Sequence, residues 1–172
     1  IAQALAFMGV QPVWDSASRR ATGFDVIPID VLDRPRIDVS LRCSGFFRDA
    51  FPAQMSLIDR AVQAVAKLDE PDDMNSLAAA VRRETAAAQA AGLSLDAAAR
   101  QSTLRVFSAK PGAYGAGLQT LVDEGIWDDR SDFAEAFLVW SSYAYGDGVA
   151  GSPARDMLEA RLGNADAVLH NQ

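Results

Sequence analysis

The sequence is poor in the residues that build metal sites and disulfides. Its 172 residues include one cysteine, Cys43, and one histidine, His170. A single cysteine cannot form a disulfide within the chain, and one cysteine with one histidine cannot complete a four-ligand zinc site. Sixteen basic against 23 acidic residues leave a net charge of −7, which argues against a nucleic-acid partner because phosphate contacts depend on clustered Lys and Arg. No apolar run approaches the roughly 18 residues of a membrane span.

The composition that remains is that of a soluble globular domain. It is 49% hydrophobic and 23% charged, and a chain of this length buries roughly 70% of its unfolded surface. The chain starts at Ile1 inside a helical pattern, without a Met or a basic lead-in. It ends at Gln172, shortly after a strand-like apolar run. We therefore expect an internal piece of a larger cytoplasmic polypeptide, the alternative being a processed or incompletely described small protein.

The first fifty residues alternate helix and strand. A helix over 1–8 is followed by short apolar segments at 12–14 and 24–29. The strongest strand signal is Arg36–Leu41, which is rich in β-branched residues and bounded by Pro35 and Gly45. This rhythm predicts an α/β fold, with layered helices around short, mostly parallel strands, in a single domain over 1–172.

Residues 54–101 read as an Ala-rich helical lobe inserted into that domain. Apolar residues at spacings of three and four, beginning with Met55 and Ile58, predict a helix to about Leu68. Asn75 or Ser76 can cap a second helix, and Ser94 a third. The acidic run 69–73 lacks the spacing of a calcium-binding loop and is interpreted as a solvated turn.

The last third returns to mixed structure. Asp132 and Glu135 resemble a helix capping box, with Phe133, Phe137, Trp140 and Ala144 on one side of the helix. Ser152 and Pro153 are typical of the start of a final helix, which Gly163 ends. The predicted order is strand 103–108, loop 110–117, helix 118–124, the capped helix, the final helix and strand 165–169.

The glycine-rich loop Lys110–Gly117 is the first candidate site. It follows a strand and precedes a helix, where backbone N–H groups can hold an anion. Lys110 precedes the glycines, unlike the lysine of a Walker loop, and the third glycine of a dinucleotide motif is missing. The loop is either a ligand contact or a turn that needs positive φ angles. Tyr114 at its tip is either an aromatic wall for a flat ligand or a core anchor.

The second candidate is the segment 44–52, after the expected strand. Ligands sit at the carboxyl ends of strands in open α/β sheets. Arg48 and Asp49 could hold a carboxylate ligand or simply pair with each other. Arg105, inside its strand, could bind an anionic ligand or pair with a nearby acidic residue. His170 could ligate a metal or move a proton, because its pKa lies near neutrality, or it could be incidental.

Several segments together resemble a known family. Their ordered set is similar to the large subunits of the cobaltochelatase and magnesium chelatase family, nearly from end to end. The matching segments are Gly9–Trp14, Arg34–Val39, Ser44–Phe51, Asp69–Pro71, Arg105–Ser108, Pro111–Gly117 and His170–Gln172. The Pro-Gly-Ala-Tyr-Gly-Ala-Gly loop and the closing His-Asn-Gln are more like the cobalt branch, since the magnesium branch tends to carry a Ser-rich loop.

The resemblance implies a metal chelatase. Large subunits of this family are long cytoplasmic polypeptides that bind the tetrapyrrole and the metal, while AAA+ partners hydrolyse ATP with Mg²⁺. In the cobalt branch, Co²⁺ is inserted into hydrogenobyrinic acid a,c-diamide during aerobic cobalamin synthesis. The resemblance makes Arg48, Asp49, Lys110 and Arg105 candidates for substrate binding, with Tyr114 packing on the ring. It makes His170 the candidate for proton or metal traffic, with the metal ligands unknown.

Two other functions stay open at this point. The chain could belong to the magnesium branch and bind protoporphyrin, or it could be a lobe that docks the ATPase partners without touching the ring. In each case we expect the isolated chain to be inactive as a chelatase, because one His and one Cys leave most of the metal chemistry elsewhere.

Overall fold

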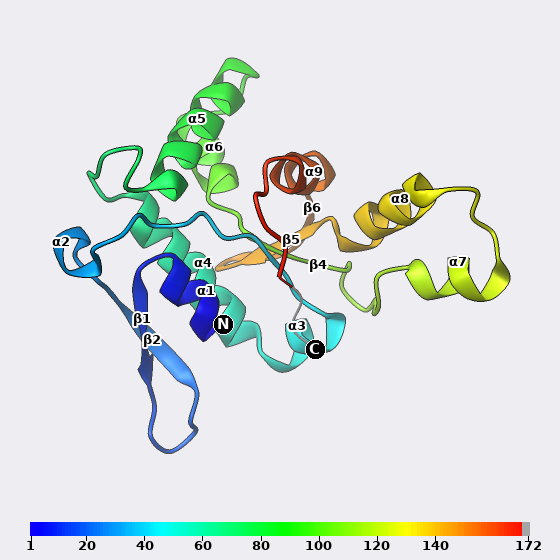
Figure 1. The fold of residues 1–172 in the computed structure, drawn as a ribbon, viewed down its shortest axis with the longest axis horizontal. Coiled ribbons are helices and arrows are strands. Elements are labelled where there is room, and N and C mark those ends of the chain that lie inside the picture. The colour runs from blue at the N-terminus through cyan, green and yellow to red at the C-terminus, as the bar shows by residue number, and fades with distance from the viewer. Residues whose placement is uncertain (170–172) are drawn as a thin grey trace.

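The computed structural model describes residues 1–169, which form helices around two sheets (Figure 1). The helices are α1 Ala2–Phe7, α2 Ile29–Leu32, α3 Gly45–Ala50, α4 Pro52–Ala66, α5 Ser76–Ala90, α6 Leu95–Ser102, α7 Leu118–Glu124, α8 Arg130–Ser141 and α9 Arg155–Gly163. The strands are β1 Val10–Trp14, β2 Ala21–Val26, β3 Leu41–Arg42, β4 Val106–Ser108, β5 Tyr143–Gly146 and β6 Val149–Pro153. The mixed α and β content agrees with the predicted fold class.

The direction of the strands corrects the sequence prediction. The larger sheet has the order β3-β4-β5-β6, in which only β3 and β4 are parallel and the other two pairs are antiparallel. Strands β5 and β6 are joined by the two residues Asp147 and Gly148, and Gly148 has a φ of 71°. A two-residue turn with positive φ forces a hairpin, so the expected mostly parallel sheet is wrong.

The sheet is covered by helices on both faces. Val106 and Tyr145 belong to the cluster that includes α4, whereas Phe107 and Ala144 pack with Leu158 of α9. These pairs follow the period-two alternation of strand side chains. The predicted layering of helices around short strands is therefore present, with α4 on one side and α9 on the other.

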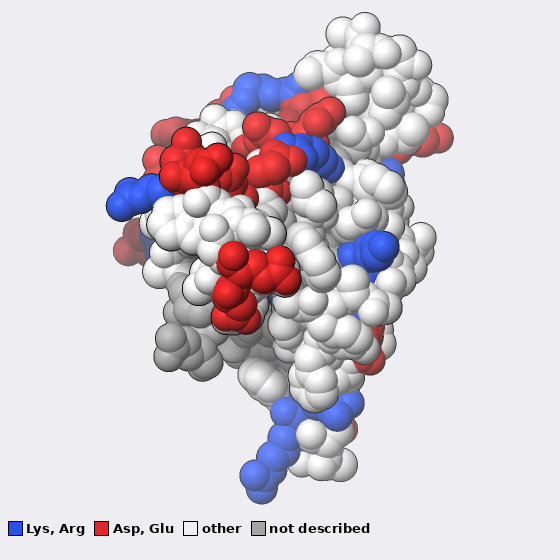
Figure 2. All heavy atoms as spheres, turned by 90° about the vertical axis from the view of Figure 1, so that its right-hand side faces the viewer, with Lys and Arg blue, Asp and Glu red and all other residues white. Residues whose placement is uncertain are grey.

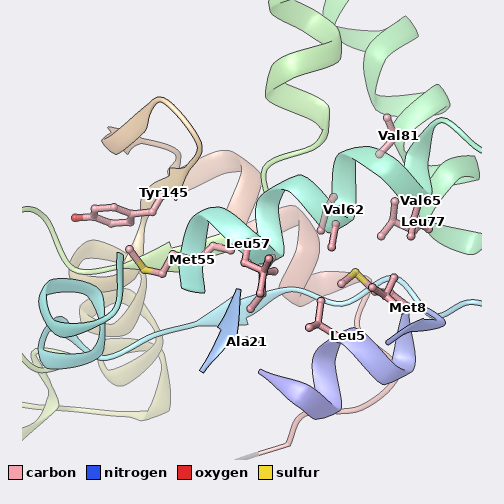
Figure 3. Packing of buried hydrophobic residues seen from close by; sticks show 14 residues of the cluster. Leu5, Met8, Ala21, Met55, Leu57, Val62, Val65, Leu77, Val81 and Tyr145 are labelled. Carbon is pink, nitrogen blue, oxygen red and sulfur yellow. The ribbon is translucent and has the colours of Figure 1, made fainter. Parts of the chain in front are cut away.

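The main core lies between α4, α1 and the β1-β2 hairpin (Figure 3). Leu5 of α1 and Met8, which follows α1, are fully buried in one cluster with α4, whose apolar stripe is the one that the sequence predicts. Asn75 and Ser94 cap α5 and α6 through their side chains, as expected. Figure 1 shows α5 and α6 extending away from this core, while α4 runs through it.

The predicted strand 36–41 is wrong. Arg36 forms only an isolated bridge with Asn75, and pairing in the sheet begins at Leu41. The Arg36 side chain is completely buried and donates to the carbonyl oxygens of Met8, Gly9 and Ile27 and to Glu70. This segment therefore ties three parts of the chain together instead of entering the sheet. Glu70, whose side chain is only 10% exposed, is a partner in that tie and not part of a solvated turn.

Three predictions in the last third also need correction. The capping box lies three residues earlier than expected, with Asp129 as the cap and Asp132 as its partner. Ala144 is in β5, beyond the helix on which the pattern placed it. Ser152 and Pro153 close β6, and the final helix begins after them. Residues 165–169 form no strand, contrary to the prediction, and the apolar side chains of Val168 and Leu169 are exposed.

Candidate functional site

The glycine-rich loop 110–117 joins the end of β4 to α7. Gly112, Gly115 and Gly117 all have positive φ, of 78°, 89° and 74°. Residues other than glycine rarely adopt this backbone conformation. The loop thus needs its glycines for its shape, and this shape sets where Lys110 and Tyr114 project.

Arg48 of α3 holds the first half of this loop. Ser44 caps the short helix by accepting a bond from the Phe47 amide, so the helix starts directly beside the loop. The buried Arg48 guanidinium donates to the carbonyl oxygens of Ala109, Lys110 and Ala113 at 2.9–3.1 Å. These bonds make Arg48 a clamp on the loop, with its charge inside the protein.

Asp49 completes a chain of contacts that reaches the surface. It accepts two bonds from Arg48, at 2.7 and 2.9 Å, and one from the Tyr114 hydroxyl at 2.7 Å. The bond from Arg48, followed by the bond from Tyr114, lowers the pKa of Asp49 to about 2. The same contact with Asp49 raises the pKa of Tyr114. At neutral pH the pair is therefore a carboxylate and a protonated phenol, and Tyr114 is held in place although 59% exposed.

The second half of the loop is held against α8. Arg42 donates to the Gly115 carbonyl at 2.6 Å and to the Ser141 hydroxyl at 3.1 Å. A Cβ on Gly117 would overlap the indole of Trp140. A pocket of about 240 Å³ opens beside this contact, lined by Lys110, Ala113, Val139, Trp140 and Tyr143. Its walls are thus loop on one side and the end of α8 and start of β5 on the other.

The structure brings four of the predicted site residues together. Arg48, Asp49 and Tyr114 are in contact, and Lys110 lies on the same loop. Arg105 lies before β4, at the end opposite the loop. It is fully buried and donates to Asp38 and to the Ser102 carbonyl, with Glu84 at 3.5 Å. Its predicted contact with a substrate stays a prediction, and its burial means that a ligand would have to displace these partners.

His170 lies outside the described residues. Within residues 1–169, no group of three or more Asp, Glu, Cys or His side chains could hold a metal ion. Burial raises the pKa of the Cys43 thiol to about 11, so this thiol stays protonated at neutral pH. The described part of the chain also contains no helix long and apolar enough to cross a membrane.

The sequence pattern did not identify Arg42 and Tyr143 as site residues, and it predicted Trp140 only as part of an apolar helix face. Arg42 follows the predicted strand directly, and the only available signal was a basic residue at a strand end. Tyr143 begins a hairpin strand that the sequence pattern did not reveal. Trp140 could have been found through Gly117 only with the tertiary contact already known.

The comparisons with known proteins agree with one another. The profile of the family described as CobN/Magnesium Chelatase matches residues 1–172. The aerobic cobaltochelatase subunit CobN of Sinorhizobium sp is 53% identical over 172 residues, which are all of this chain and 13% of that protein. A magnesium-chelatase subunit of Chlorobaculum parvum is 35% identical over 170 residues, or 99% of this chain and 13% of that protein.

The fold is also that of a solved relative. The catalytic subunit of cobaltochelatase from Mycobacterium tuberculosis superposes with a TM-score of 0.79 and 42% identity, over 92% of this chain and 13% of that one. The chain thus spans about one eighth of the length of these relatives. Both the sequence and the fold match along nearly the whole chain, and so the chain belongs to the CobN/magnesium chelatase family.

Proposed function

We propose that this chain is part of the large subunit of an ATP-dependent cobaltochelatase, which inserts Co²⁺ into hydrogenobyrinic acid a,c-diamide in aerobic cobalamin synthesis. The observation that carries the proposal is the 53% identity to a CobN subunit over the whole chain, against 35% to a magnesium-chelatase relative. The partners are AAA+ type ATPase subunits that use ATP and Mg²⁺, and the complex is cytoplasmic. Because the chain is only 13% of the CobN length, the isolated chain is expected to have no chelatase activity.

The surface formed by the glycine-rich loop 110–117 is the part of this chain that we assign to binding of the macrocycle. Tyr114 is exposed and held by Asp49, and an aromatic ring fixed in this way can pack on a flat ligand. Arg48 is 4% exposed and bonded to three loop carbonyls, so its role in the proposal is to position the loop. Asp49 has the same role toward Tyr114, and Lys110 is the exposed cation of the loop.

Metal insertion requires that pyrrolic protons leave and that weak ligands deliver the metal. The pKa of Asp49, near 2, makes it a poor proton acceptor at neutral pH. The base and the metal ligands are therefore assigned elsewhere in the full-length protein, with His170 as the residue of this chain proposed for proton or metal traffic. Co²⁺ is substrate in this scheme, and ATP is bound by the partners.

The proposal is tested by reconstitution of the full-length protein with its ATPase partners. Metal insertion is followed by absorption, with Co²⁺ and hydrogenobyrinic acid a,c-diamide in one set and Mg²⁺ and protoporphyrin in the other. ATP-dependent insertion of cobalt alone is the expected result. Insertion of magnesium into protoporphyrin would instead assign the protein to the magnesium branch of the family.

A second function is favoured by the exposed apolar residues of α7 and the segment after it. Val122, Ile126 and Trp127 are 57%, 58% and 47% exposed, and α7 has no buried residue. Such a surface is typical of a contact with another protein surface. The lobe could dock the ATPase subunits, which is tested by pull-down of those subunits with this chain. Capture of the ATPases without binding of either tetrapyrrole would favour docking over substrate contact.

A further inference from the structure

The pocket between the glycine loop and α8 is lined by three residues whose side chains can donate hydrogen bonds. Its lining residues Lys110, Trp140 and Tyr143 carry an ammonium, an indole N–H and a phenol O–H. Within residues 1–169 none of these three side-chain groups makes a hydrogen bond or ion pair. No carboxylate lines the pocket. A lining that includes a cation and two further side chains able to donate hydrogen bonds, with no carboxylate, favours an anionic ligand group such as a carboxylate.

The walls of the pocket are built rigidly. Trp140 is in contact with the backbone of Gly117, where a Cβ would overlap the indole. Arg42 links the loop to Ser141, the residue after Trp140. Arg48 holds the other side of the loop, including the carbonyl oxygens of Lys110 and Ala113. The aromatic wall and the loop are thus held at a set separation, although Trp140 remains 39% exposed.

The size of the pocket limits what can enter. About 240 Å³ is less than the 300–1,000 Å³ of pockets that enclose a whole drug-sized ligand. It is enough for a short apolar arm that ends in a carboxylate. Ala113 lines the pocket and Tyr114 follows it in the chain, so a ring packed on Tyr114 could send one side arm into the pocket.

We propose that this pocket is a subsite for one carboxylate side arm of the tetrapyrrole, with Lys110 binding the carboxylate and Trp140 and Tyr143 enclosing the arm. The inference rests on the proposed function, because it takes a tetrapyrrole as the ligand. It adds a specificity-determining site: a macrocycle whose side arms are neutral loses the contact with Lys110. It also assigns different roles to the three cations. Arg42 and Arg48 hold the loop in shape, and Lys110 binds the carboxylate of the ligand.

The test compares two ligands and two lysine variants of the full-length protein. Dissociation constants are measured by absorption titration for hydrogenobyrinic acid a,c-diamide and for the same macrocycle with its carboxylates converted to methyl esters. Lys110→Ala should weaken binding of the acid about tenfold, the scale of a charge-assisted hydrogen bond, and leave binding of the ester unchanged. Lys67→Ala, which removes the only other lysine of the chain at an exposed site, should change neither.

Two further variants keep the wall in place. Lys110→Arg should restore most of the affinity for the acid, because it retains a cation. Tyr143→Phe keeps the ring and removes only the hydroxyl, and should weaken binding of the acid about threefold.

Each alternative outcome has a distinct meaning. If Lys110→Ala binds the acid as tightly as the parent does, the proposed subsite is wrong. If the variant loses the same affinity for the acid and for the ester, Lys110 has a structural role and the subsite is also wrong. Failure of the full-length parent to bind either macrocycle overturns the proposed function itself.

Discussion

Two regions of this molecule bury their apolar residues to very different degrees. Around α4, side chains such as Leu57 and Val62 are fully enclosed, and outside the arm described next even the side chains of the cations Arg36 and Arg105 have no exposed surface. In the arm formed by α7, α8 and their connection, residues 118–141, the only buried residue is Ser141. Figure 2 looks onto this side of the molecule and shows groups of carboxylates beside a broad uncharged surface.

The difference separates a region that is stabilised by its own contacts from a region whose exposed side chains are available to bind another molecule. The α4 region satisfies its own charges: Asp59, with no exposed surface, accepts from Arg100, Gln63 and the Asp147 amide. The arm instead leaves apolar and aromatic side chains in solvent. The glycine loop lies at the border, anchored in the first region by Arg48 and in contact with the second through Trp140. We therefore expect substitutions in the first region to change stability and those in the second to change binding.

The largest effect should come from the buried ion pair between Arg36 and Glu70. Arg36→Ala leaves the Glu70 carboxylate without its main partner and removes the Arg36 donors from the carbonyl oxygens of Met8, Gly9 and Ile27. Breaking such a pair costs about 3–5 kcal/mol. Arg82→Ala removes an exposed pair with Asp72 and should cost less than about 1 kcal/mol. Urea unfolding of the two variants measures the difference, and equal midpoints would contradict the assigned contrast.

The comparison between regions is tested directly by two apolar truncations. Leu57→Ala in α4 opens a cavity in the main core and should lower the free energy of unfolding by about 2–5 kcal/mol. Val122→Ala in α7 removes a side chain that is 57% exposed and should change it by no more than about 0.5 kcal/mol. Chemical denaturation of both proteins checks the prediction. A large loss of stability in Val122→Ala would contradict the exposure of Val122 and show that α7 packs against the rest of the protein.

Local signals in the sequence predicted what depends on neighbouring residues. The helix stripe from Met55, the caps Asn75 and Ser94 and the glycine loop were all visible, because spacing and side-chain chemistry decide them. The strand prediction for 36–41 failed because its β-branched residues follow Arg36, whose burial depends on carbonyl oxygens far along the chain. The β5-β6 hairpin was missed because its alternation is short and its small residues resemble a loop.

The candidate site was predicted in its parts but not in its roles. Arg48, Asp49 and Tyr114 were identified individually, and the structure places them in contact. That Arg48 points inward to three carbonyls follows from the tight approach of α3 to the loop, where a Cβ on Gly45 would lie 2.7 Å from the Ala113 oxygen. No spacing in the sequence encodes this approach. The pocket residues from α8 and β5 join the loop only in the folded chain.

Two glycines of the loop offer a matched pair at the border between the regions. Gly117→Ala and Gly112→Ala both place a side chain at positive φ, at a cost of about 1–3 kcal/mol. Only at Gly117 does the new Cβ also overlap Trp140, since nothing lies within 4 Å at Gly112. Gly117→Ala should therefore be the less stable variant and the only one to shift the tryptophan emission. Identical spectra would mean that Trp140 is not held by this glycine.

The smallest effect concerns the acid limb of the pH dependence. The folded-state pKa of Asp49 is lowered to about 2, below its ordinary value of about 3.9. Its ionised form therefore stabilises the folded chain fully above the unfolded value, and this contribution is lost as the pH falls toward 2. The exposure of Asp49 keeps the effect small. Asp49→Asn should remove this part of the pH dependence, as measured by unfolding between pH 4 and 2.

The contributions of the two partners of Asp49 can be separated by titrating its carboxyl carbon by NMR. Arg48 lowers the pKa of Asp49 more than Tyr114 does. Tyr114→Phe removes only the weaker of the two and should place the titration midpoint between about 2 and the ordinary value of about 3.9. A midpoint that stays near 2 in Tyr114→Phe would mean that the phenol does not stabilise the charge, leaving the exposed ring held by packing on α3 alone.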